Sequence, residues 1–208
     1  MNASLVHSFD GLASRTDALG ARSVGFTGAI HGEGVSTIAI GTALALGALR
    51  HEDVLLVDAN WVRPSLTADA DLESAPGLAD YLAKRAALTE VVRPAGSSHL
   101  AFLPVGDRAA ARPTLRALGA FLANDVAAFQ TVLIDLPPVL AGEAFVAPWV
   151  TLLDHVFVVL REAATPLPVV RQALDKLGLA TPEIVLNRGP VVSSEIATGL
   201  LTAERHHA

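Results

Sequence analysis

The chain alternates short, continuous apolar runs with longer segments that mix apolar and polar positions. Six runs of five or six residues are predicted as strands: Ser23–Thr27, Asp53–Asp58, Leu100–Val105, Thr131–Asp135, His155–Leu160 and Glu183–Asn187. Continuous apolar runs, as opposed to alternating ones, are typical of parallel strands buried on both faces. The pattern therefore predicts a mostly parallel sheet.

The segments between these runs carry helical patterns. Helices are predicted at Gly34–Leu49, Leu78–Ala87, Pro113–Phe129 and Leu167–Leu177, and Ala59–Ala75 is expected to be irregular. Strands that alternate with helices predict an α/β fold, with a doubly wound sheet, helices on both faces and right-handed crossovers. We expect one domain over residues 23–190. An N-terminal tail or short helix (1–22) precedes it and a C-terminal tail (191–208) follows it.

Composition narrows the class of protein. Hydrophobic residues make up 51% of the 208 residues, which allows a large core, and a net charge of −6 without a basic block argues against a nucleic-acid surface. The lack of cysteine excludes disulfides, thiolate chemistry and cysteine metal sites. The N-terminus lacks the regions of a signal peptide, and Gly34–Leu49 is uncharged over sixteen residues. This is short of the roughly 20 that span a bilayer, so we expect a buried helix in a soluble chain.

The most informative segment joins the first predicted strand to the first predicted helix. A glycine turn, Gly32-Glu33-Gly34, lies between them and is followed by Ser36 and Thr37. A strand, a glycine turn and a helix form the layout of a phosphate-binding loop, in which backbone N–H groups and the helix N-terminus face phosphate oxygens. That pattern places a lysine before the Ser/Thr, and this chain has Val35 instead.

Two further polar positions follow buried strands. Asp58 and Asp135 end their apolar runs, and ligands on such sheets bind at the carboxyl ends of the strands. Three segments therefore converge on one rim. In the functional interpretation Ser36 holds Mg²⁺ through its hydroxyl, Asp135 orients the water shell of the ion, and Asp58 assists. In the simpler alternative, the turn is an ordinary strand-to-helix connection and Asp58 caps a helix.

These residues together resemble the bacterial tyrosine kinases (BY-kinases) of the CpsD/CapB type, from capsule and exopolysaccharide assembly. The resemblance is carried by seven motifs: HGEGVST at His31–Thr37, VLLVDANWVRPSL at Val54–Leu66, PGLADYLA at Pro76–Ala83, LAFLPVGDRAAARPTLRAL at Leu100–Leu118, VLIDLPPVL at Val132–Leu140, HVFVVLR at His155–Arg161 and IVLNR at Ile184–Arg188. It implies a P-loop NTPase fold of the MinD/ParA-like class. It also implies an ATP-dependent kinase that a membrane chain-length regulator activates and that autophosphorylates a tyrosine-rich tail.

The sequence departs from this family at several positions. Val35 replaces the P-loop lysine, and Asn60 replaces the second acidic residue of the Asp-x-x-x-x-Arg-Pro element that runs from Asp58 through Arg63. No tyrosine follows Asn187, and the Glu-x-x-Arg-x-x-Arg helix that forms rings in this family is not found in residues 1–22. A lysine about 4 Å from a phosphate oxygen contributes roughly 4 kcal/mol at an effective dielectric constant near 20. We therefore expect weak binding of ATP, ADP and Mg²⁺ and doubtful catalysis.

We interpret the chain as a degenerate kinase (pseudokinase) that serves polysaccharide polymerisation and export. It is expected to dock to a Wzz-like membrane chain-length regulator at the inner face of the cell membrane, and to form a homo-oligomer as a further option. The expected nucleotide-binding residues are Gly32, Glu33, Gly34, Val35, Ser36, Thr37 and Arg63; Ser36 and Asp135 are the metal ligands, and Asp58 and Asp135 are vestigial or weak catalytic residues. Two alternatives stay open: an active autokinase or ATPase of the same pathway, and a MinD/ParA-like positioning ATPase. Tyr81, Trp61 and Trp149 are expected to pack, and His31 to face solvent.

Overall fold

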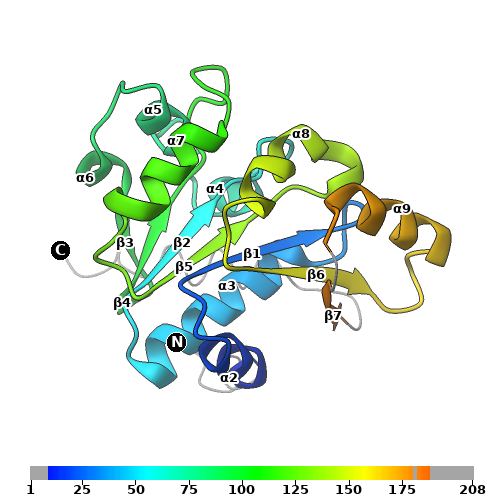
Figure 1. The fold of residues 1–208 in the computed structure, drawn as a ribbon. Coiled ribbons are helices and arrows are strands. Elements are labelled where there is room, and N and C mark those ends of the chain that lie inside the picture. The colour runs from blue at the N-terminus through cyan, green and yellow to red at the C-terminus, as the bar shows by residue number, and fades with distance from the viewer. Residues whose placement is uncertain (1–8, 180–181, 188–208) are drawn as a thin grey trace.

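The computed structural model describes residues 9–179 and 182–187, and it forms one sheet with helices on both faces (Figure 1). The strands are β1 (Ser23–Gly28), β2 (Val54–Asp58), β3 (Arg93–Ala95), β4 (Ser97–Leu103), β5 (Thr131–Asp135), β6 (His155–Arg161) and β7 (Glu183–Asn187). They lie in the order β3-β4-β2-β5-β1-β6-β7, and each neighbouring pair is parallel except β3 and β4. The predicted doubly wound, mostly parallel sheet is confirmed. The expected C-terminal tail lies outside the described residues.

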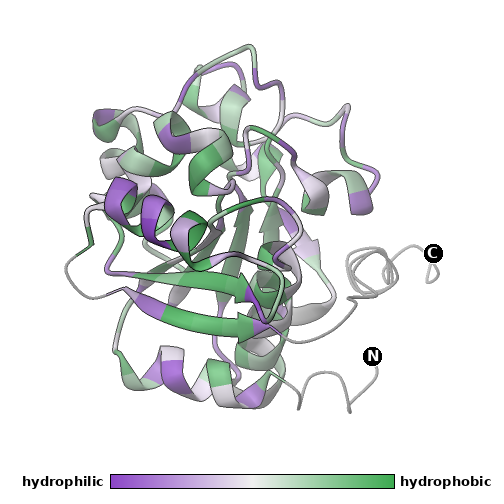
Figure 2. Cartoon of the chain, turned by 90° about the vertical axis from the view of Figure 1, so that its right-hand side faces the viewer, coloured by the Kyte–Doolittle hydropathy of each residue, from purple (hydrophilic) through white to green (hydrophobic). Residues whose placement is uncertain are grey.

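The helices cover the two faces unequally. They are α2 (Asp10–Ala18), α3 (Val35–Ala45), α4 (Ser65–Asp69), α5 (Leu78–Leu82), α6 (Leu88–Val91), α7 (Leu115–Ala120), α8 (Val139–Val150) and α9 (Leu167–Leu177), with π-helical turns η1 (Leu46–Arg50) and η2 (Phe121–Asp125). In Figure 1 α2 and α3 lie below the sheet, and α5, α7, α8 and α9 lie above it. Figure 2 shows strands that are mostly hydrophobic, between outer helices that mix hydrophobic and hydrophilic residues.

Successive residues along the central strands pack into two separate hydrophobic cores, one on each face of the sheet. Leu56 and Phe157 belong to the core beneath α3, whereas Leu55 and Val158 belong to the core beneath α7, α8 and α9. All four side chains are fully buried. A strand that buries both faces has no solvent side, which explains why the strand sequences are apolar throughout and do not alternate.

The helix that leaves the glycine turn is buried on all sides. Apart from Ser36, each residue of α3 is buried, in agreement with the uncharged helix expected at Gly34–Leu49. Gly41 lies against the ring of Phe9, which precedes α2, and a Cβ at Gly41 would come within 2.5 Å of that ring. Ala13 of α2 is buried in the same core. The segment expected as a tail or short helix thus contains a helix that packs onto the domain.

Several predicted element boundaries were wrong for identifiable reasons. The helix expected at Leu78–Ala87 ends at Leu82, and Lys84 has a left-handed backbone with φ of 60°. The helix expected from Pro113 begins at Leu115, because the Thr114 side chain accepts a hydrogen bond from the Ala117 amide and caps it. The segment expected to be irregular contains α4.

Three further elements were missed: β3, the four-residue helix α6, and α8. β3 has three residues, one of them proline, and pairs at the sheet edge, where short strands leave little sequence signal. α8 follows Pro137-Pro138, is kinked at Gly142 and contains Pro148, so its helical pattern is interrupted. Within the described ranges, the helices are all too short or too polar to cross a bilayer.

Candidate functional site

The glycine turn opens directly into the N-terminus of α3. Gly32 and Gly34 both have left-handed backbones, with φ of 87° and 86°, and Gly34 is the N-cap of the helix. Glycine adopts this conformation without the steric cost that a Cβ would bring. The first amide groups of a helix have no acceptor inside it, so those of Val35, Ser36 and Thr37 are available at the loop. This is the backbone arrangement of an anion site.

The Ser36 hydroxyl connects this loop to the end of β5. It donates a hydrogen bond of 2.6 Å to Oδ2 of Asp135, and its oxygen lies 2.8 Å from the hydroxyl of Ser65 at the start of α4. The structure therefore brings together Ser36 and Asp135, the two residues predicted as metal ligands, and adds Ser65, which the sequence reasoning did not single out.

Asp58 and Asp135 form a buried pair of carboxyl groups. They are register partners on β2 and β5, and neither is exposed to solvent. Burial raises the pKa of Asp58 to about 6, although hydrogen bonds from Thr67 and Asn60 lower it. Burial, followed by the charge of Asp58, raises the pKa of Asp135 well above its usual range. The pair thus resists holding two negative charges without a cation.

Asp58 is fixed more tightly than its partner. Its Oδ2 accepts from both the amide and the hydroxyl of Thr67, each at 2.8 Å, and its Oδ1 accepts from the Asn60 amide at 3.1 Å. The Thr67 oxygen in turn accepts from the Val105 amide at 3.0 Å, just past the end of β4. Asp58 therefore joins the ends of two strands, in partial agreement with the capping role left open as the simpler alternative.

The residues at this rim fit a magnesium ion. Mg²⁺ binds oxygen ligands, commonly one or two carboxylates with several waters. Among the described residues, Oδ1 of Asp135 is a buried carboxyl oxygen that has no hydrogen-bond partner. A hydroxyl, Ser36, lies on the other oxygen of the same carboxyl group. A carboxyl oxygen without a partner and a nearby hydroxyl are two oxygen ligands that Mg²⁺ could bind.

Val35 faces two environments. Its side chain is 9% exposed and belongs to the core beneath α3, yet it also borders a pocket of about 350 Å³ over the loop. The loop therefore stays open although the lysine position is apolar. The chain has two lysines, Lys84 and Lys176. Lys176 pairs with Glu143, and Lys84 borders a separate pocket beside Tyr81. Neither supplies the missing cation at the loop.

Arg63 is the basic residue that the structure does place at the pocket. Its backbone amide donates to the Asn60 side chain at 2.9 Å, which closes a turn after β2. Its side chain is exposed on the pocket rim, and within the described residues it forms no ion pair. Of the described arginines and lysines, Arg63 alone borders this pocket.

Glu33, predicted among the nucleotide-binding residues, is 2% exposed. Its Oε2 accepts from the Ile30 amide at 3.0 Å and its Oε1 from the Thr165 hydroxyl at 2.7 Å. The Asn187 side chain donates to the Glu33 carbonyl at 3.0 Å. The carboxylate is thus bonded inside the protein. Thr37, also predicted at the site, is 8% exposed and borders the pocket.

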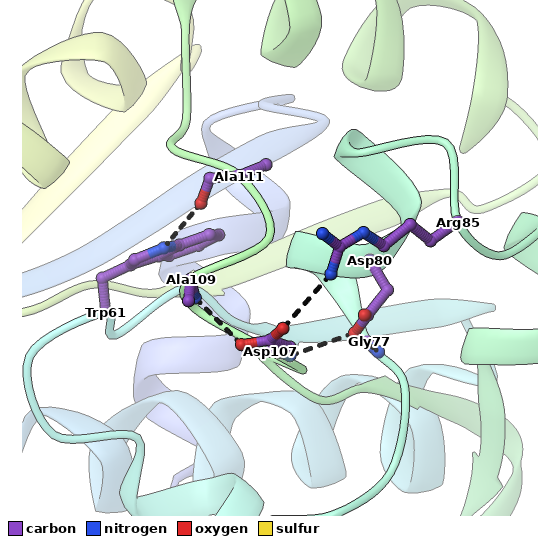
Figure 3. A network of polar contacts seen from close by, with 7 residues as sticks. All are labelled: Trp61, Gly77, Asp80, Arg85, Asp107, Ala109 and Ala111. Carbon is purple, nitrogen blue, oxygen red and sulfur yellow. Dashed lines mark hydrogen bonds and ion pairs between the residues drawn. The ribbon is translucent and has the colours of Figure 1, made fainter.

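A second polar network holds the neighbouring loops (Figure 3). Asp80 at the start of α5 accepts from the amides of Gly77 and Asp107, each at 3.0 Å. Asp107 also pairs with Arg85 at 3.3 Å. The indole of Trp61, after β2, donates to the Ala111 carbonyl at 3.2 Å. These contacts tie the loops that follow β2 and β4 to each other.

The remaining predicted positions are placed as follows. Trp61 and Trp149 pack, at 5% and 0% exposure, and His31 is exposed in the loop, as expected. Tyr81 is partly buried against Phe121 and donates to Asp125. Sequence reasoning missed Ser65, Thr67 and Thr165. The first two lie just beyond the Arg63-Pro64 element, so that motif was the available signal; Thr165 had none.

No protein-family model matches the chain. Among curated proteins, tyrosine-protein kinase YwqD of Bacillus subtilis (strain 168) is 31% identical over 123 residues, covering 58% of this chain and 52% of that protein. The chain thus matches about half the length of this relative.

Solved structures resemble a larger share of the chain. The VpsO kinase domain has a TM-score of 0.72 at 25% identity, over 90% of this chain and 94% of that one. The BceF tyrosine kinase domain has a TM-score of 0.73 at 26% identity, over 89% and 78%. The septum site-determining protein MinD of Pyrococcus horikoshii, solved with Mg-ADP, has a TM-score of 0.60 at 20% identity, over 78% and 67%, which supports the fold. With the rim geometry described above, these similarities confirm the resemblance drawn from the sequence: the chain is similar to bacterial tyrosine kinase domains and has a P-loop fold like theirs.

Proposed function

We propose that this chain is a degenerate BY-kinase-like module that binds Mg-nucleotide weakly and does not transfer phosphoryl groups. The observation that carries the proposal is the combination of an open glycine turn with an apolar side chain at Val35. Phosphoryl transfer depends almost entirely on positioning and charge stabilisation. Loss of a cation worth roughly 4 kcal/mol at an effective dielectric constant near 20 therefore affects turnover and affinity together.

The residues that remain suit binding. The amides at the start of α3 would hold phosphate oxygens. Ser36 and Asp135 would hold the magnesium ion, which supplies positive charge next to the phosphates when it is bound. Arg63, which lines the pocket, would contact phosphate oxygens through its guanidinium. Asp58 would keep the loop after β2 in place through its bonds to Thr67 and Asn60.

We place the module in a polysaccharide polymerisation and export complex, as the cytoplasmic partner of a membrane chain-length regulator. The similarity to bacterial tyrosine kinase domains supports the pathway. The described helices offer no membrane span, so association with the inner face of the membrane would come through the regulator. Cell fractionation with and without the regulator tests this part. Membrane association that persists without the regulator would contradict the docking.

Nucleotide turnover tests the catalytic part. The purified chain is incubated with Mg-ATP, alone and with the cytoplasmic segment of the regulator, and released phosphate is measured. We expect no turnover above the rate of a Ser36→Ala, Asp135→Ala double variant in either condition. Calorimetric titration of Mg-ADP into the same samples measures binding separately. Turnover well above the double variant would refute the degenerate-kinase proposal.

A second candidate is an active ATPase or autokinase of the same pathway. The observation that favours it is Arg63, an exposed guanidinium on the pocket rim that forms no ion pair among the described residues. A rim arginine could take over charge stabilisation from the lost lysine. If turnover is found, Arg63→Ala should abolish it under this candidate, whereas Arg112→Ala, on the loop beyond the pocket, should leave it unchanged.

A further inference from the structure

The buried carboxylate of Glu33 is the least expected group in the glycine turn. It lies between Gly32 and Gly34, is 2% exposed, and forms no ion pair with the described cations. Removing a carboxylate from water is costly unless hydrogen bonds compensate for the lost hydration. A phosphate-binding loop also gains nothing electrostatically from an added negative charge. The position of this side chain therefore calls for a structural explanation.

The hydrogen bonds of Glu33 connect three parts of the chain. Its carboxylate closes the loop on itself through the Ile30 amide and reaches Thr165, in the connection between β6 and α9. Its carbonyl accepts from Asn187, the last residue of β7. Asn187 is in turn fixed to the end of β6, since its carbonyl accepts from the Glu162 amide at 2.9 Å. The glycine turn is thus fastened to the ends of two strands.

The fit around Glu33 is close. A Cβ at Gly28, the last residue of β1, would lie 2.4 Å from Oε2 of Glu33 and 3.1 Å from the Val159 carbonyl. Only glycine leaves room for the carboxylate at this point in the strand. The missing side chain at Gly28 therefore leaves the room into which the Glu33 side chain points.

We propose that Glu33, Thr165 and Asn187 form a brace that holds the glycine turn in its phosphate-accepting shape before any ligand arrives. Glu33 is then a positioning residue and not a phosphate ligand. A turn with two left-handed glycines has much conformational freedom to lose on binding. Fixing the turn in advance removes that loss from the binding step. The inference rests on the proposed nucleotide binding for its effect on affinity, but not for its effect on the loop itself.

Thr165→Val tests the brace, because it removes the hydroxyl and leaves the charge of Glu33 and the shape of residue 165 nearly unchanged. Thr165 is partly exposed, so the variant is expected to fold. The full chain is compared with Thr165→Val, Thr165→Ser and Asn187→Ala. Hydrogen exchange of residues 29–37 is measured without ligand, and calorimetry gives the affinity for Mg-ADP. Exchange in β5 is the control for global stability.

We expect Thr165→Val and Asn187→Ala to speed exchange in the loop while β5 is unchanged, and Thr165→Ser to restore the wild-type rate. Affinity for Mg-ADP should fall about tenfold in the valine variant, which corresponds to the loss of one hydrogen bond to a charged group. Loop exchange in Thr165→Val equal to that of the wild type would overturn the brace. If the wild type itself does not bind Mg-ADP, the proposed nucleotide binding fails, and the exchange rates still decide whether the brace exists.

If Glu33 acted only through its charge, Thr165→Val would change neither measurement and Glu33→Gln would raise the affinity for Mg-ADP. In the brace, Glu33→Gln weakens the bonds to Ile30 and Thr165 and speeds exchange. The two explanations thus predict different results for the same pair of variants.

Discussion

Asp58 and Asp135 occupy paired positions on the parallel strands β2 and β5, and solvent reaches neither carboxyl group. Their raised pKa values follow from that burial and, for Asp135, from the neighbouring charge. A group whose pKa is higher in the folded state stabilises the fold below its unfolded pKa, and this stabilisation is lost as pH rises through the folded pKa. For Asp58 this interval runs from 3.8 to about 6.

The ligand-free protein should therefore become less stable as pH rises through this interval, because the buried carboxyl groups lose their protons and become negatively charged. Asp135→Asn removes one of the two charges, so it should flatten this dependence. At about pH 8 we expect the variant to melt higher by about 2–8 °C, corresponding to roughly 1–2 kcal/mol for a domain of this size. Thermal melts of both proteins from pH 5 to pH 8 check this. A variant that melts below wild type at the upper pH would contradict it.

Magnesium should control nucleotide binding. Asp69 lines the pocket, and Ser36, which also lines it, donates to the buried carboxyl group of Asp135. Arg63 is the one arginine or lysine that lines the pocket in the described part of the chain. Free ADP would meet uncompensated negative charge, so Mg²⁺ should improve ADP affinity by at least about tenfold. Titrations of ADP with Mg²⁺ and with EDTA measure this, and Asp135→Asn should remove most of the difference. Equal affinity in both buffers would argue against a metal site here.

The purified protein should show no tyrosine autophosphorylation. Tyr81 is the only tyrosine of the chain. Its hydroxyl donates to Asp125, and burial together with that carboxylate raises its pKa to about 12, which disfavours the nucleophilic phenolate. Incubation with labelled ATP and phosphopeptide mapping provide the test. Phosphate on Tyr81, absent from a Tyr81→Phe control, would show that kinase function is retained.

The loops that follow β2 and β4 depend on a glycine contact. A Cβ at Gly77 would lie 2.2 Å from the Pro104 carbonyl, which accepts from the Leu78 amide at 2.8 Å. Backbone cannot give way as a side chain can, so Gly77→Ala should lower the free energy of unfolding by about 2–4 kcal/mol. Gly11→Ala in α2 is the matched control, since nothing lies within 4 Å of its added Cβ. It should be neutral or stabilising by up to about 1 kcal/mol. Denaturant unfolding of both variants checks the contrast.

The sequence predicted the sheet because strands buried on both faces leave continuous apolar runs, such as Thr131–Asp135. It predicted the convergence of Ser36, Asp58 and Asp135 because parallel strands end at one edge. It could not predict the α8 helix, whose pattern Gly142 and Pro148 interrupt. The sheet and the rim could be predicted because local patterns mark them, and α8 was missed because its local pattern is interrupted.

The brace depends instead on distant residues. Thr165 and Asn187 lie 132 and 154 positions from Glu33 in the chain. A single threonine or asparagine in a loop or at a strand end carries no sign of its partner. Only the order of β1, β6 and β7 in the sheet brings them together. The inward orientation of Glu33 could therefore not be predicted from the sequence of the glycine turn alone.

Val35→Lys tests whether the missing cation is what limits the site. Val35 borders the pocket over an open loop, so a longer side chain can extend toward the phosphates without forcing the loop apart. Asp69 lines the same pocket, and a carboxylate there would limit the cost of the new charge before ligand arrives. We expect Mg-ADP to bind at least about tenfold more tightly, from a charge-assisted contact to phosphate.

Val35→Met is the matched control, because it adds similar length without charge and should leave the affinity within about twofold of wild type. Asn60→Asp combined with Val35→Lys should change turnover more than affinity, since a further carboxylate repels phosphate but can orient a metal or nucleophile. Calorimetry and a melting curve for each variant complete the comparison. A folded Val35→Lys protein that binds Mg-ADP no better than Val35→Met would show that the glycine turn has lost its phosphate geometry along with its lysine.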